Sequence, residues 1–178
     1  VLIARLDQEP DVTIRRAILL SLGEFGPDRL SSDRRLALLA VLVQLYRDDP
    51  DPGIHGAAEW LLRQWQQEAR FKEIDKELMS RAASAPGGQR QWYINRQGQT
   101  FTLIRGPLEF RMGSPLWEPD RIAGNEKPHV RVIPRSYAIS TKAVTVGQYE
   151  RFLAEQPQWR RPDYPTRYSP DANGPMIW

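Results

Sequence analysis

Residues 49–55 read DPDPGIH, and an earlier stretch of the same kind, residues 9–15, reads EPDVTIR. In both stretches proline and aspartate form a turn, and the aspartate can accept hydrogen bonds from the free N–H groups that begin a helix. Asp51 follows Asp11 by 51 − 11 = 40 positions, and a period of about 40 residues is typical of solenoids built from helix pairs. The two turns therefore predict helical repeats in the first part of the chain.

The residues after the first turn have the spacing of a helix with one apolar face. Ile14, Ile18 and Leu22 lie four positions apart, which places them on one side of a helix. Gly23 and Gly26 follow, and we expect them to end the helix by adopting positive φ angles.

Two further helices are predicted before the pattern becomes polar. They cover residues 32–46, with Ser31 or Ser32 as the cap, and residues 54–65. Helix pairs joined by such turns resemble HEAT repeats. The alternative is an ordinary helical bundle in which the turn recurs by chance.

The composition changes at residues 82–90, where small residues and glycines are typical of a linker. We therefore expect HEAT-like repeats at residues 1–81 and a second domain at residues 91–178. Two β-rich runs flank a glycine-containing turn, which predicts a hairpin, and the second domain has further strand candidates. The predicted strands are residues 92–95, 99–104, 108–112 (half-buried), 129–133 and 137–140.

The clearest helix start of the chain follows the last strand. Thr145 stands three residues before Gln148, which is the spacing of a capping box. Pro157 should end this helix.

Four motifs follow one another in this second half: FRMGS at residues 110–114, NEKPH at 125–129, SYAIS at 136–140 and VTVGQYERFL at 144–153. In order and spacing they resemble the opening region of the formylglycine-generating (sulfatase-modifying factor) domain. The resemblance covers about residues 92–178. It implies the N-terminal portion of an α+β domain of the C-type-lectin-like fold.

That family oxidises a cysteine of sulfatases to formylglycine with cysteines of its own, and this chain contains no cysteine. The oxidising pair and the calcium-binding loops of the family lie further toward the C-terminus. The resemblance thus implies copper and calcium only for a part that is not in this chain. We assign no catalytic, cofactor-binding or metal-binding residue here.

Two functions remain open. We expect the chain to be a fragment, cut at both ends, of a bacterial sulfatase-modifying-factor protein, and to be inactive alone. The resemblance implies that in some bacterial proteins this domain is fused to a kinase. Alternatively, it is a non-catalytic module of helical repeats and a lectin-like domain. Both predict a protein or peptide partner. A cysteine pair in the rest of the domain would favour the first.

Composition argues against other classes of partner. The net charge of +3 comes from scattered arginines, so nucleic acid is not expected. No segment approaches the roughly 18 apolar residues of a membrane span. The sequence leaves the compartment open, with the cytoplasm as our expectation.

A few residues are of types that bind metals or partners, but we expect each of them to have a structural role. Glu126 and His129 are too few for a metal site, which usually takes three or four ligands, so we expect a turn and a histidine bonded to backbone. The acidic cluster at residues 48–51 is predicted to cap a helix rather than to bind calcium. Trp117 lies in a polar loop, and we expect it to be tucked onto the domain.

Overall fold

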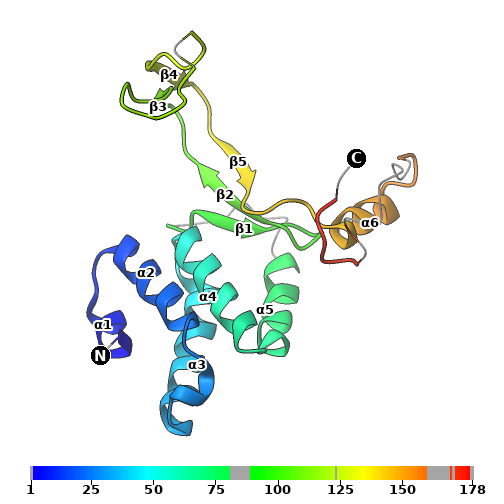
Figure 1. Cartoon of the computed structure of the whole chain (residues 1–178). Helices are drawn as coiled ribbons and strands as arrows, with labels where there is room; N and C mark the ends of the chain where they lie inside the picture. Colours follow the sequence, from blue (N-terminus) through cyan, green and yellow to red (C-terminus); the bar gives the residue numbers. More distant parts are fainter. Residues whose placement is uncertain (1, 81–88, 123, 160–168, 170, 177–178) are drawn as a thin grey trace. The chain divides into compact units, whose positions relative to one another are not determined.

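The computed structural model describes residues 2–80, 89–122, 124–159, 169 and 171–176. In this part the chain is a mixed α+β protein with six α-helices and two small sheets (Figure 1). The chain divides into two compact units, one made of Val1–Thr102 together with Ser140–Trp178 and the other of Leu103–Ile139. The first of these is called unit 1 below and the second unit 2.

Unit 1 begins with five helices. They are α1 (Leu2–Gln8), α2 (Val12–Gly23), α3 (Ser32–Asp48), α4 (Pro52–Gln64) and α5 (Glu68–Ser80), with a 3-10 turn at Pro27–Arg29. Helix α4 packs against both α2 and α3, and Figure 1 shows these three side by side. Leu19, Leu42, Ile54 and Leu61 are fully buried between them.

The predicted aspartate caps are confirmed. Asp11 Oδ1 accepts hydrogen bonds from the N–H groups of Thr13 and Ile14, at 2.7 and 3.0 Å. Asp51 Oδ1 accepts from Gly53 and Ile54 in the same way, at 2.8 and 2.9 Å. The two turns thus repeat in structure as they do in sequence.

The acidic cluster supplies the cap of α4 through Asp51, as predicted, while Asp49 binds groups within the turn and on α2. Asp49 Oδ1 accepts from the N–H of Asp51 at 3.0 Å. Its other oxygen accepts from Arg15 of α2, also at 3.0 Å. The second turn is therefore tied to α2 by an ion pair whose carboxylate is buried.

The expectation for the glycines that end α2 is wrong. Gly98 and Gly113 are the described glycines with positive φ, at 80° and 106°, and neither Gly23 nor Gly26 is among them. A Cβ at Gly23 would instead lie 2.1 Å from the ring of Trp60. Close packing of α4 on α2 therefore explains the absence of a side chain there.

The β-rich half begins inside the core of the helices. Strand β1 (Trp92–Ile94) pairs antiparallel with β2 (Thr100–Ile104), and β5 (Tyr137–Ser140) lies next to β2. Trp92 and Ile94 belong to the same buried cluster as the helical leucines. The predicted hairpin is confirmed, and its first strand completes the helical core. The predicted linker lies outside the described residues except for residues 89–90.

Helix α6 (Val146–Glu155) starts and ends as predicted. Thr145 accepts from the N–H of Gln148 at 3.2 Å, and the Gln148 side chain accepts from the N–H of Thr145 at 3.0 Å. The next N–H groups donate to the carbonyls of Gly174 and Ala172. The start of α6 is thus saturated by its capping box and by residues 172–174.

Unit 2 contains a two-stranded antiparallel sheet. Strands β3 (Leu108–Met112) and β4 (His129–Ile133) pair with Phe110 opposite Arg131. The strands lie where the sequence predicts them, but the half-buried pattern expected for β3 is wrong. No described residue between 103 and 139 is buried, since no other layer of this unit covers the ribbon.

Trp92 gives a first test of this fold. It is fully buried and its indole N–H donates to the carbonyl of Asp49 at 2.8 Å. We expect Trp92→Ala to lower the free energy of unfolding by about 3–5 kcal/mol, because it leaves a cavity and removes this hydrogen bond. Urea unfolding followed by circular dichroism measures the change.

The control is Trp159→Ala. Trp159 is 60% exposed, so its removal should change the free energy of unfolding by no more than about 0.5 kcal/mol. Equal losses in the two variants would contradict the role of Trp92 as a core residue shared by helices and sheet.

Candidate functional site

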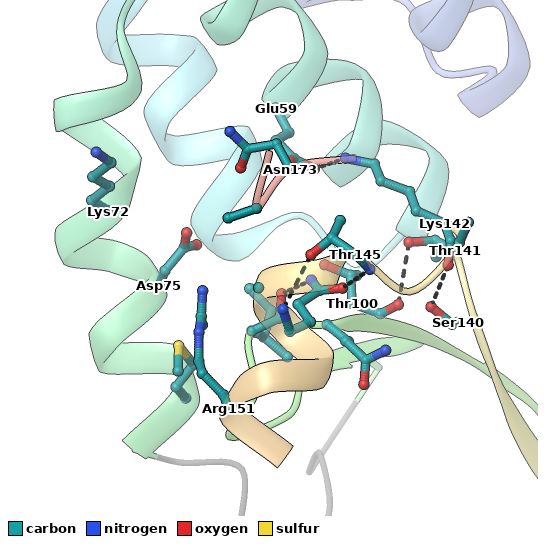
Figure 2. A pocket seen from close by; sticks show the side chains of 18 of the residues that line it. Glu59, Lys72, Asp75, Thr100, Ser140, Thr141, Lys142, Thr145, Arg151 and Asn173 are labelled. Carbon is teal, nitrogen blue, oxygen red and sulfur yellow. Dashed lines mark hydrogen bonds and ion pairs between the residues drawn. The ribbon is translucent and has the colours of Figure 1, made fainter. Parts of the chain in front are cut away.

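A cleft of about 730 Å³ lies within unit 1. Its walls come from α4, α5, the β1–β2 hairpin, residues 140–145, α6 and residues 172–173 (Figure 2). Helical and β-rich parts of the chain thus contribute to one concave surface. The volume lies within the roughly 300–1,000 Å³ typical of ligand pockets.

Glu59 is held at the helical wall by two cations. Its carboxylate accepts from Lys142 Nζ at 2.6 Å and from Arg63 Nε at 3.0 Å. Burial by itself would raise the pKa of Glu59, but the charges and hydrogen bonds of Lys142 and Arg63 outweigh it and lower the pKa. Glu59 is therefore ionised at neutral pH and its charge is already compensated.

A second carboxylate, Asp75, is bonded to a buried phenol. The hydroxyl of Tyr46 donates to Asp75 Oδ1, and Tyr46 is only 2% exposed. Burial raises the pKa of Asp75, with the charge of Glu59 adding to the effect, although the bond from Tyr46 opposes it. Burial and the Asp75 charge also raise the pKa of Tyr46 far above its usual value, so the phenol remains the donor.

His55 lies behind Tyr46 in a stack of three rings. Its ring centroid is 4.4 Å from that of Tyr46 and 3.7 Å from that of Trp92. Nδ1 is 2.7 Å from the carbonyl oxygen of Tyr46, and since a carbonyl only accepts, Nδ1 carries the proton. Nε2 is buried and has no hydrogen-bond partner among the described residues. Burial lowers the pKa of His55 to about 4.

Cations outnumber carboxylates in the described lining of the cleft. Five basic side chains face two acidic ones; the basic residues are Arg63, Lys72, Lys76, Lys142 and Arg151, and the acidic residues are Glu59 and Asp75. In Figure 2 the side chain of Arg151 extends from α6 toward Asp75 on α5. The terminal nitrogen Nη1 of Arg151 also donates to the carbonyl of Gln97 at 2.9 Å, which holds the guanidinium against the hairpin.

Unit 2 offers a different kind of surface. Nine large apolar side chains are exposed in it: Phe110, Met112, Leu116, Trp117, Ile122, Val130, Val132, Tyr137 and Ile139. The strand register places Phe110 and Met112 on one face of the ribbon and Val130 and Val132 on the other. Trp117 is 83% exposed, so the expectation that it is tucked onto the domain is wrong.

The candidate metal ligands Glu126 and His129 each form a hydrogen bond within unit 2. His129 is exposed and its Nδ1 lies 2.8 Å from the carbonyl of Lys127, which is the backbone bond expected for it. Glu126 accepts from the hydroxyl of Ser114 at 2.5 Å. The residues described by the structure contain no group of three or more His, Cys, Asp or Glu that could hold a metal ion.

Sequence reasoning missed the whole cleft. Glu59 and Arg63 are four positions apart and could have been paired on one helix. Lys142 and Asp75 carry no motif, and Lys142 reaches Glu59 across 83 positions. Only the packing of the hairpin and α6 with the helices brings these residues together.

Comparison with known proteins gives no relative to guide the interpretation. No protein-family model, curated protein sequence or solved structure matches the chain. None of the described helices combines the length and apolar character that crossing a membrane requires.

The buried neutral histidine predicts a pH dependence of stability. The pKa of His55 is about 4 in the folded chain and about 6.5 when unfolded. The contribution of neutral His55 to the free energy of unfolding is fully present above pH 6.5. It falls as the pH drops toward 4, because the unfolded chain binds the proton at a higher pH than the folded chain does. The loss from this group should be about 3 kcal/mol between pH 7 and pH 4.

The measurement compares urea midpoints of the wild type and His55→Phe over this pH range. Phenylalanine keeps a ring between Tyr46 and Trp92 but cannot titrate, so its stability should fall less steeply with acid. Parallel pH profiles of the two proteins would show that His55 is not buried in its neutral form.

Proposed function

We propose that this chain is part of a sulfatase-modifying-factor-type protein and provides its binding architecture, not its thiol chemistry. In this interpretation residues 1–81 are HEAT-like repeats and residues 91–178 open a domain of the C-type-lectin-like fold. The order of the four motifs supports the proposal, as do their positions: FRMGS covers the end of β3, SYAIS contains β5 and VTVGQYERFL covers the start of α6.

The observation that carries the proposal is the exposed ribbon of unit 2. A two-stranded sheet is marginally stable by itself and needs a layer against which to pack. The described residues between 103 and 139 provide no such layer, and nine large apolar side chains are in solvent. We propose that another part of the same sulfatase-modifying-factor-type domain covers this ribbon, as the closing layer of one fold.

A protein-interaction module is the second candidate, and the loop after β3 favours it. Leu116 and Trp117 are 81% and 83% exposed and adjacent. Aromatic side chains of this kind dominate the binding energy of many protein interfaces. In this case the ribbon and its loop would bind a separate protein.

Photocrosslinking tests both candidates in the protein expressed from its complete gene. Benzoylphenylalanine at position 117 should crosslink within the same polypeptide if the domain closes over the ribbon. A crosslink to a second protein would favour the interaction module. The control places the same group at position 36, since Leu36 is 58% exposed on α3. A yield at position 117 no higher than at position 36 would contradict both.

The absence of cysteine predicts that the chain alone does not carry out the family's oxidation. The chain contains no cysteine, and the family's oxidation uses cysteines of the enzyme, so the chain alone should not convert a Cys-x-Pro-x-Arg peptide. The peptide is incubated with the chain and copper, and mass spectrometry measures aldehyde. Turnover above the level given by copper alone would contradict the assignment of architecture to this chain.

A further inference from the structure

We infer that the cleft of unit 1 binds an acidic peptide segment, one that presents two or more carboxylate or phosphoryl groups. The inference concerns a different surface from the ribbon of unit 2 and does not depend on the family to which the chain belongs. It rests on the charge of the lining, on the pairing of its carboxylates and on the shape of the cavity.

The charge of the cleft is positive once its internal pairs are taken into account. Five basic and two acidic side chains line it. The negative charge of Glu59 is compensated by Lys142 and Arg63, so it repels an incoming anion only weakly. Asp75 already accepts the hydroxyl of Tyr46, so one of its two oxygens has a partner and the five cations still outnumber the two carboxylates.

Two lysines of α5 are available for a ligand. Lys72 makes no hydrogen bond or ion pair with the residues that the structure describes, and Lys76 pairs with the exposed Glu73 at 2.8 Å. An ion pair between such exposed groups contributes little, so Lys76 can exchange Glu73 for a ligand at small cost. Arg151, fixed by Gln97, adds a planar group that can bind a carboxylate or phosphoryl group with two hydrogen bonds.

The form of the site favours a short peptide over a nucleic acid. A nucleic acid is bound by basic side chains spread along a surface that follows its backbone. Here the cations surround one cavity of about 730 Å³. Such a cavity accommodates a few side chains of an extended segment, and its helical wall belongs to the repeat-like part of the chain, an architecture that commonly binds peptides on concave surfaces.

Fluorescence anisotropy of labelled probes tests the inference with the whole chain. The probes are a hexaglutamate peptide, a Gly-Ser peptide with two phosphoserines, a hexaglutamine peptide and a ten-residue oligothymidylate. We expect at least one acidic peptide to bind, and the comparison between the two distinguishes carboxylate from phosphoryl recognition. Binding should weaken as salt rises from 50 to 300 mM.

The variant that locates the site is Lys72→Gln/Lys76→Gln. It should weaken acidic peptide binding about tenfold, which corresponds to about 1.4 kcal/mol. The matched control is Lys127→Gln/Arg131→Gln, which removes two exposed cations from unit 2 and should leave the affinity unchanged. Urea midpoints of all variants confirm that they fold, and a single Lys72→Gln variant repeats the test with the smallest change.

Three results would overturn the inference. The first is that neither acidic peptide binds more tightly than hexaglutamine. The second is that both double variants lose affinity equally, which would indicate attraction to the whole surface. The third is that oligothymidylate binds more tightly than both acidic peptides and loses affinity with Lys72→Gln/Lys76→Gln, which would make the cleft a nucleic-acid site.

Discussion

The stack of Tyr46, His55 and Trp92 is the contact on which the arrangement of unit 1 depends. A buried indole must find an acceptor for its N–H group, and Trp92 finds it in the carbonyl of Asp49. Asp49 binds Arg15, and Asp51 of the same turn caps α4. This turn thus begins α4, binds α2 and receives β1, the first strand of the β-rich half.

Residues just before Trp92 reinforce the same contact. The N–H of Gln91 donates to the carbonyl of Pro50 at 2.9 Å, and Arg90 donates to the carbonyl of Arg47 at 2.6 Å. The guanidinium of Arg90 also lies 4.6 Å from the ring centroid of Trp92. The carbonyls left free at the end of α3 and in the turn are therefore satisfied by Trp92 and by the two residues before β1.

The sequence was a good guide where local chemistry decides the structure. The aspartate caps, the capping box of Thr145 and Gln148 and the hairpin at Gly98 depend on neighbours within a few positions, and the structure has all of them. Gly23 was misjudged because its reason is a ring on another helix. The strand β3 was misjudged because alternation predicts a buried face only when a second layer exists.

The cleft shows why a site can be invisible in a sequence without motifs. In the sequence, Lys142 has the features of a solvated loop lysine and Glu59 those of an ordinary helix carboxylate. Neither type of residue indicates a ligand by itself. The contact between Lys142 and Glu59 depends on the buried rings that pack β1 against α4. This packing sets the position of residues 140–145 relative to the helix. The electrostatic character of the cleft therefore depends on the hydrophobic packing at Trp92.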